Sequence, residues 1–261
     1  MKKNKISVII PTLSPSKDNS RLLRTINSVE QQLIPSEYEV EIVLGIDQGA
    51  NPTINQTTFA FPLHIAKSPK NNQAAALNAA LSMARGSVIA FIEDDDRWSR
   101  FFLSYALKLI TKADFITTNQ IEVNTQEQIV GILDFPTPSG WVVRKPTLDS
   151  LGGFNESYKF HLDNEFLGRA RDSGVRRIHM IESTAPTSEN VIKDRRPHLH
   201  NIISFYHPYI TIARHQDPIP LVKREVREDS SLAKTKTNKA DISTSNNEYK
   251  QLRALYGRIP W

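Results

Sequence analysis

The chain of 261 residues contains no cysteine, and this absence removes two kinds of chemistry. Without thiols there is no disulfide framework and no thiolate nucleophile or metal ligand. No apolar run approaches the roughly 20 residues that span a bilayer, so no transmembrane helix is predicted. The first apolar stretch stops at Pro11 and lacks a small-residue cleavage site, so we expect no signal peptide and a cytoplasmic protein.

The charge balance is modestly basic, with 33 Lys and Arg against 28 Asp and Glu and a formal net charge of +5. Such an excess suits phosphate groups or an anionic membrane surface without selecting either. The sequence has no repeat of basic and aromatic residues and no zinc-finger spacing, so we expect no nucleic-acid partner. Peripheral contact with the inner face of the membrane is compatible with this charge.

Apolar runs of strand length alternate with helical patterns over the first 120 residues. Strands are predicted at 6–10, 40–46, 63–66, 88–92 and 115–118, and helices at 19–32, 73–85 and 101–111. This alternation is typical of an α/β fold in which helices flank a mostly parallel sheet, with ligands at the carboxyl ends of the strands. Beyond about residue 130 the alternation weakens, although a further helix is predicted at 163–172.

Four consecutive acids, Glu93 to Asp96, directly follow the apolar run 88–92. Two carboxylates about 5 Å apart repel by roughly 3 kcal/mol at an effective dielectric constant near 20, so water or a cation must offset them. Strand alternation places Glu93 with Asp95 and Asp94 with Asp96, and each pair offers two oxygens to Mg²⁺ or Mn²⁺. The alternative is a solvated loop or the start of a helix.

An ordered series of short motifs between residues 5 and 175 resembles family 2 glycosyltransferases of the GT-A fold. The matching segments are Val8-Ile9-Ile10-Pro11-Thr12, Asp47-Gln48-Gly49-Ala50, Asn78 in its alanine-rich helix, Phe91-Ile92-Glu93-Asp94-Asp95-Asp96, Gly152-Gly153-Phe154-Asn155-Glu156 and Asp163-Asn164-Glu165-Phe166-Leu167-Gly168-Arg169. The resemblance implies a metal-dependent enzyme that moves a sugar from a nucleotide-diphospho-sugar, a UDP-sugar above all, to the hydroxyl of a glycan or small acceptor. It also implies inversion at the anomeric carbon.

On the donor side, the resemblance implies a metal role for Asp95 and a ribose contact for Asp94, while Asp96 completes either role. The cofactor is then Mn²⁺ or Mg²⁺. The other nucleotide-sugar-binding candidates are Pro11, Thr12, Asp47 and Asn78. For Asp47 an Asx turn before a glycine is the alternative interpretation.

On the acceptor side, Asp163 matches the usual general base of the family, and Glu165 could act instead because it is in register with Arg169. Without the resemblance, the same residues are a helix N-cap at Asp163 and an internal ion pair between Glu165 and Arg169.

Two further groups are candidates for ligand contact. Arg195 and Arg196 could close over the diphosphate, with His198 or His200 as a further metal ligand, or could belong to a solvated surface loop. Trp141 could stack on a sugar ring or pack in the core.

We expect a GT-A domain at 1–222, with a nucleotide-sugar-binding half at 1–120 and an acceptor-side half at 121–222, followed by a C-terminal appendage at 223–261. Within the appendage, 228–247 has few large apolar side chains and predicts a flexible linker before a short docked helix.

Two rival functions stay open at this stage. A metal-dependent nucleotidyltransferase often carries a first loop rich in glycine and basic residues, which 11–17 lacks. A non-catalytic relative that binds a sugar or a partner is kept open by Gln48 and Leu162, which depart from the family pattern.

Overall fold

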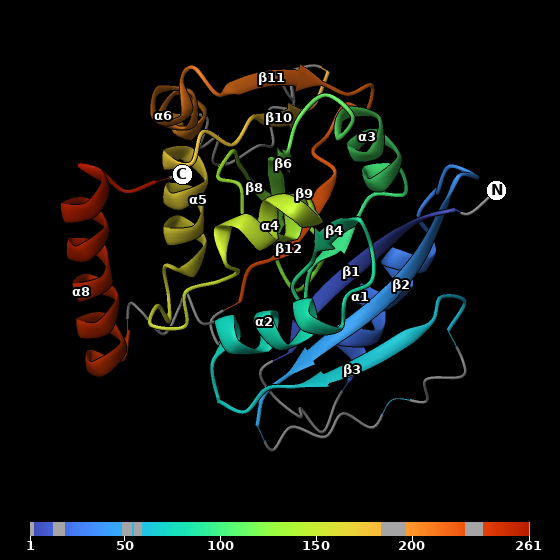
Figure 1. Cartoon of the computed structure of the whole chain (residues 1–261), viewed down its shortest axis with the longest axis horizontal. Helices are drawn as coiled ribbons and strands as arrows, with labels where there is room; N and C mark the ends of the chain where they lie inside the picture. The colour runs from blue at the N-terminus through green and yellow to red at the C-terminus, as the bar shows by residue number, and fades with distance from the viewer. Residues whose placement is uncertain are drawn as a thin grey trace.

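The computed structural model describes residues 3–12, 19–48, 54, 59–183, 197–227 and 237–260. A large sheet contains β1 (Asn4–Thr12), β2 (Tyr38–Ile46), β3 (Leu63–Lys67), β4 (Val88–Phe91), β6 (Phe115–Thr118), β9 (Trp141–Arg144), β10 (Arg177–Ile181) and β11 (Ile210–Arg214). Its eight strands are ordered β11-β10-β6-β9-β4-β1-β2-β3. All run parallel except β9, which is antiparallel to both of its neighbours. This confirms the predicted α/β fold with a mostly parallel sheet (Figure 1).

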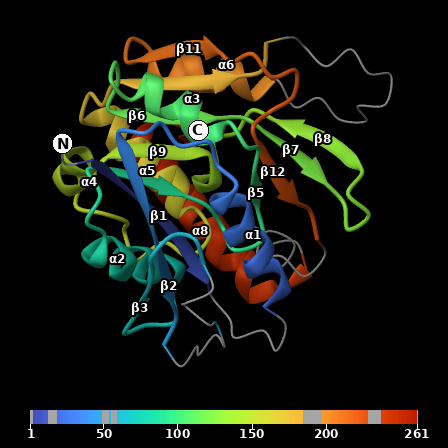
Figure 2. The ribbon, with the colours of Figure 1, turned by 90° about the vertical axis from the view of Figure 1, so that its right-hand side faces the viewer.

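A second, four-stranded sheet lies beside the first. Its strands are β5 (Arg97–Trp98), β12 (Val222–Glu225), β7 (Gln120–Val123) and β8 (Ile129–Leu133), in that order. β12 pairs with β5 on one side and with β7 on the other. Figure 2 shows β12 entering this sheet close to α1 (Ser20–Glu30). A late segment of the chain therefore lies beside the residues that follow β4.

Helices cover both faces of the large sheet. They are α1, α2 (Gln73–Met83), α3 (Phe102–Leu109), α4 (Lys145–Leu151), α5 (Leu162–Asp172), α6 (Pro197–Tyr206) and α8 (Lys239–Tyr256), with a 3₁₀ turn, η2 (Pro138–Gly140), before β9. The strands and helices predicted within the first 120 residues are all present, with ends that shift by up to two residues. Among the described helices, none is long and apolar enough to cross a membrane.

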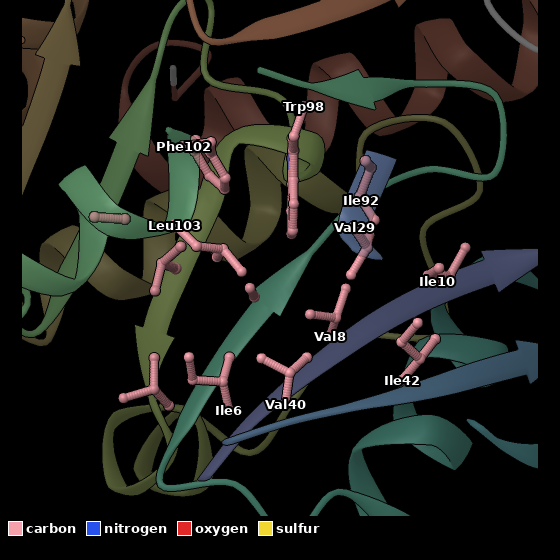
Figure 3. Packing of buried hydrophobic residues seen from close by; sticks show 14 of the residues in the cluster. Ile6, Val8, Ile10, Val29, Val40, Ile42, Ile92, Trp98, Phe102 and Leu103 are labelled. Atoms are coloured by element: carbon pink, nitrogen blue, oxygen red, sulfur yellow. The ribbon is translucent and has the colours of Figure 1, made fainter. Parts of the chain in front are cut away.

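The central part of the large sheet is buried on both faces, so β4 and the carboxyl-terminal parts of β1 and β2 are mainly apolar. Val8 and Ile10 join a cluster with helix residues such as Val29 and Phe102, shown in Figure 3. Ile9, the residue between them, points into a second cluster with residues of α2 and α5. Burial of each such side chain contributes about 1.5–3 kcal/mol, so the two layers hold the strand ends in fixed positions.

The helix α2 packs unusually close to β2. A Cβ atom on Gly45 would lie 2.2 Å from the carbonyl oxygen of Ala76, so only glycine fits at this position. The helix begins at Asn72, whose Oδ1 accepts the N–H groups of Ala74 at 2.8 Å and Ala75 at 3.3 Å. This contact places the start of α2 beside the end of β2.

The prediction of a flexible linker over 228–247 is wrong for its residues 239–247, which form the first half of α8. Asn238 caps this helix through the N–H groups of Ala240 and Asp241. Only Glu248 and Leu252 of the helix are buried, so its apolar face is too narrow to mark a docked helix in the sequence. α8 is longer than the short C-terminal helix that the sequence predicts, and Figure 1 shows it beside α5.

Candidate active site

The carboxyl ends of β1, β2 and β4 meet at one edge of the large sheet. Thr12 ends β1 and is buried, and its hydroxyl donates a hydrogen bond to Asp94 Oδ2. Asp47 directly follows β2, and its N–H donates to the carbonyl oxygen of Thr12 at 3.4 Å. Thr12, Asp47 and Asp94 thus lie along the same edge, because parallel strands end on the same side.

Three of the four acids after β4 gather their carboxylates. One oxygen each of Glu93, Asp95 and Asp96 lies within 4.8 Å of the others. The pairing of Glu93 with Asp95 follows the predicted alternation, whereas Asp94 points to Thr12. Asp96 departs from the prediction because the chain turns here, with the Asp96 N–H donating to the Glu93 carbonyl at 3.2 Å. We call Glu93, Asp95 and Asp96 the acidic cluster.

Two hydrogen bonds hold Asp96 in place within the acidic cluster. The Ser139 hydroxyl donates to Asp96 Oδ2 at 2.5 Å, and Thr25 Oγ1 donates to the Asp96 carbonyl at 2.7 Å. Its side chain is buried, and Oδ1 has no hydrogen-bond partner among the described residues. A buried carboxylate oxygen left in this way is costly unless a cation meets it. Because hard divalent ions prefer carboxylate oxygens, the three residues fit Mg²⁺ or Mn²⁺.

Burial and mutual repulsion shift the protonation of these acids. Burial, and then the charge of Asp95, raise the pKa of Glu93 to about 7. The same two causes raise the pKa of Asp94 to about 6 and the pKa of Asp96 well above its usual value. The ionised forms of these carboxylates are therefore disfavoured at this edge of the sheet, and a cation that binds here would stabilise them.

Two arginines, one in β12 and one just after it, supply positive charge to the acidic cluster. Arg227, two residues beyond β12, donates to Asp95 Oδ2 through its guanidinium. Arg224 lies in β12, 3.8 Å from the Glu122 carboxylate, and the charges of Asp96 and Glu93 raise its pKa against the effect of burial. Sequence reasoning missed both as site residues, although the basic stretch 223–227 was the available signal.

Asp163 lies at the start of α5 and is half-buried. Its Oδ1 accepts the N–H of Asn164 at 2.8 Å, and burial raises the pKa of Asp163. The charge of Asp163 contributes to the raised pKa of Glu93, so the two carboxylates are close enough to interact. Asp163 and Glu93 are therefore within electrostatic range of each other, while the role of Asp163 as the base stays a prediction.

Glu165, the other candidate base, is engaged elsewhere. Its two oxygens accept from Arg169 Nε at 2.6 Å and Arg169 Nη2 at 2.8 Å. Arg169 also donates to the carbonyl oxygens of Leu151 and Gly153, so the pair ties α5 to the segment before it. Since the Glu165 side chain is buried with both oxygens occupied, the geometry matches the internal ion pair.

Two other candidates have structural contacts. Asn78 accepts the Phe154 N–H at 2.9 Å and donates to the Phe154 carbonyl at 2.9 Å and to Glu156 Oε1 at 3.2 Å, so it anchors the loop before α5. Trp141 is fully buried among aromatic rings, including Phe91 and Phe166, and is a core residue.

Of the remaining candidate residues, the structure describes Pro11 and Asp47 but not the side chains of the three candidates between residues 195 and 198. Pro11 is buried within β1. Asp47 is buried, with Oδ1 unpartnered among the described residues, and burial raises its pKa. Arg195, Arg196 and the side chain of His198 lie outside the described residues.

A mostly parallel sheet with nucleotide-site candidates at its carboxyl edge, an acidic turn after β4 and a carboxylate on the facing helix defines an α/β protein of the GT-A class. The model of the family described as Glycosyl transferase family 2 matches residues 7–167. The chain belongs to glycosyl transferase family 2 and is a family 2 glycosyltransferase.

Solved structures share the fold at low sequence identity. S. aureus TarS superposes with a TM-score of 0.54 at 16% identity, covering 95% of this chain and 43% of TarS. TarS 1–349 in complex with UDP gives 0.53 at 14% identity, covering 97% and 72%. The mannosyltransferase PcManGT from Pyrobaculum calidifontis, in complex with GDP-Man and Mn²⁺, gives 0.53 at 16%, covering 71% and 59%. No curated protein matches the sequence.

Proposed function

We propose that this enzyme transfers a sugar from a nucleotide-diphospho-sugar, with a UDP-sugar as the expected donor, to a hydroxyl group of a glycan or small acceptor. The observation that carries the proposal is the acidic cluster at the end of β4. TarS in complex with UDP-GlcNAc and PcManGT in complex with GDP-Man and Mn²⁺ support this donor class and a divalent cofactor.

In this proposal Glu93, Asp95 and Asp96 hold Mn²⁺ or Mg²⁺, and Thr12, Asp47 and Asp94 contact the nucleoside. A bound divalent ion would supply positive charge that stabilises the leaving nucleoside diphosphate. These acids are preorganised, since Ser139 fixes Asp96 and Thr12 fixes Asp94.

Asp163 accepts the proton of the acceptor hydroxyl as the new bond to the anomeric carbon forms and the bond to the diphosphate oxygen breaks. The raised pKa of Asp163 suits this role, because a base works best when its pKa approaches the working pH. Direct displacement of this kind inverts the anomeric configuration, as the family resemblance implies.

We place the donor half at 1–120 and the acceptor half at 121–222, and residues 223–227 of the predicted appendage then join the donor site through Arg224 and Arg227. We also propose a cytoplasmic location, and the net charge of +5 is compatible with contact at the anionic inner face of the membrane.

A thermal-shift panel of UDP, GDP, ADP and their sugar conjugates, each with and without Mn²⁺, tests the proposal. We expect the nucleotides of one nucleobase to raise the melting temperature, and to do so only when Mn²⁺ is present, because a ligand that binds the native state stabilises it. The conjugate of that base should then release its nucleoside diphosphate when acceptor is supplied. Binding without any release would instead indicate a non-catalytic relative, and no shift with any nucleotide would overturn the proposal.

A further inference from the structure

Arg227 already occupies the acidic cluster as a cation. Its guanidinium donates to Asp95 Oδ2, and its Nε lies 3.9 Å from Glu225 Oε1. The side chain is 14% exposed, so this is an enclosed contact and not a surface ion pair. The two partners are 132 residues apart in the chain, and only the position of β12 in the second sheet brings them together.

The contact uses the same carboxylate that the metal proposal needs. Asp95 contributes one of the three oxygens that lie within 4.8 Å of one another. A divalent ion among these oxygens and a guanidinium on Asp95 would be like charges at close range, which repel strongly away from bulk water. Full occupation of the cluster by a metal ion therefore requires Arg227 to leave Asp95.

The backbone around Arg227 permits such a movement. β12 ends at Glu225, and the Val226 N–H still donates to the Val123 carbonyl at 2.8 Å. Arg227 comes directly after this hydrogen bond, which is the last one between the two segments within the part of the chain that the structure describes. Arg224, by contrast, lies within β12, so it stays beside the cluster when Arg227 moves.

We propose that Arg227 is an exchangeable cation, which neutralises Asp95 in the nucleotide-free enzyme and moves to the donor diphosphate when metal and nucleotide enter together. The movement of Arg227 to the donor diphosphate rests on the proposed function. A guanidinium binds phosphate oxygens in a bidentate manner, so the diphosphate gives Arg227 the partner that it loses on Asp95. Metal alone offers no such partner and must compete with Arg227.

The consequence is a coupling between the two ligands. Metal binds weakly alone and tightly with a nucleoside diphosphate, and by linkage the nucleotide gains the same factor from the metal. Removal of the Arg227 charge should therefore change the two affinities in opposite directions.

The experiment compares Arg227→Gln with the wild type by calorimetric titration of Mn²⁺ alone and of UDP at saturating Mn²⁺. We expect Mn²⁺ alone to bind at least about fivefold more tightly and UDP at least about tenfold more weakly, within the range of ordinary site coupling. Arg227→Lys, which keeps the charge, should restore part of the coupling. If the affinities for Mn²⁺ and for UDP both stay unchanged, or both fall, then Arg227 does not exchange between Asp95 and the diphosphate.

Arg176→Gln is the matched control, because Arg176 also pairs with a carboxylate, Asp114 at 3.1 Å, but lies at the opposite end of β6 and β10. It should leave both affinities unchanged. The Mn²⁺ titration needs no nucleotide, so it separates the two proposals. If wild type binds no nucleotide in the panel above yet Arg227→Gln gains Mn²⁺ affinity, the neutralising role stands while the transferase function and the move to diphosphate fail.

Discussion

The carboxylate of Glu248, in the middle of α8, accepts the backbone N–H of His161 at the start of α5, with 3.0 Å between the two atoms. It also accepts the N–H groups of Phe160 at 2.9 Å and Lys159 at 2.7 Å. A buried acid from the C-terminal helix thus satisfies three donors just before Asp163. The position of the proposed base therefore depends on a helix about 85 residues further along the chain.

Glu248→Ala should lower both stability and transfer. The three N–H groups, which are only partly exposed to water, lose their acceptor, and a donor left unsatisfied away from water costs about 1–3 kcal/mol. Because the start of α5 is then free to shift, we expect the turnover number to fall at least about tenfold while the donor KM changes little. Thermal melts and steady-state kinetics measure both effects.

Asp241→Asn is the control for this change, because Asp241 lies on the same helix but pairs with the exposed Lys159 at 2.8 Å. A pair of this kind contributes about 0–1 kcal/mol, so stability and turnover should stay close to wild type. Equal losses in the two variants would mean that α8 stabilises the fold without positioning Asp163.

Asp163→Asn should abolish transfer and spare donor binding. The amide cannot take the acceptor proton, and loss of a general base typically costs about 10²–10⁴-fold in rate. The thermal shift with Mn²⁺ and nucleotide should match that of the wild type. Unchanged transfer would remove Asp163 from the mechanism.

Glu165→Gln provides the contrast, because it weakens the buried pair with Arg169 without touching the acidic cluster. We expect a lower melting temperature, since loss of one partner of a buried pair costs about 3–5 kcal/mol. The turnover number of the folded enzyme should fall much less than in Asp163→Asn.

The metal-free protein should become less stable as the pH rises from about 5 to about 8. Glu93 has a pKa of about 7 in the folded state against 4.5 as its ordinary value, so the folded protein holds more protons than the unfolded chain between these values. The free energy of unfolding then falls as Glu93 ionises. Melting temperatures measured against pH in EDTA should show this decline.

Mn²⁺ should oppose the decline, because the ion replaces the protons on the acidic cluster. Its stabilising effect should be largest above about pH 7 and small near pH 5. Glu93→Gln is the control, and its EDTA curve should be flatter than that of the wild type. A wild-type curve that rises with pH in EDTA would contradict the expected protonation.

Gly45→Ala should destabilise the protein and weaken nucleotide binding. The new Cβ would lie 2.2 Å from the carbonyl oxygen of Ala76, and a backbone atom cannot move aside as a side chain can. Overpacking typically costs about 1–3 kcal/mol, and here it pushes the start of α2 away from Asp47. Urea unfolding and the nucleotide thermal shift measure the two effects.

Gly257→Ala is the control for this substitution. Gly257 has a φ of +73° and no neighbour within 4 Å of a new Cβ, so only backbone strain is added. This variant should lose stability while its nucleotide binding remains as in the wild type. If Gly45→Ala binds nucleotide normally, the contact between β2 and α2 does not shape the donor site.

The fold was largely predictable because local patterns encode it. Strands buried on both faces read as continuous apolar runs, and β6 at 115–118 was predicted to the residue. The acids after β4 were noticeable in the sequence because four consecutive charged residues directly follow a continuous apolar run. The narrow buried face of α8 gave no comparable signal.

The details of the site depend on long-range contacts, which periodicity does not encode. Ser139 reaches Asp96 across 43 positions, and Arg227 reaches Asp95 across 132. Strand alternation also ends where the chain turns, so Asp96 joined Glu93 and Asp95 instead of Asp94. Candidate residues of the site could therefore be proposed from the sequence, but the residues that they contact in the folded protein could not.

The antiparallel strand β9 has a consequence for how the protein is made. β9 is inserted between β4 and β6, and the other neighbour of β6 is the still later β10. As the chain leaves the ribosome, β6 has neither neighbour and β4 keeps an open edge until residue 144 emerges. Open edges invite pairing with other chains, so a fragment truncated before β9 should aggregate during synthesis. Because β9 pairs with both β4 and β6, we expect that the proposed donor and acceptor halves do not fold when they are produced separately.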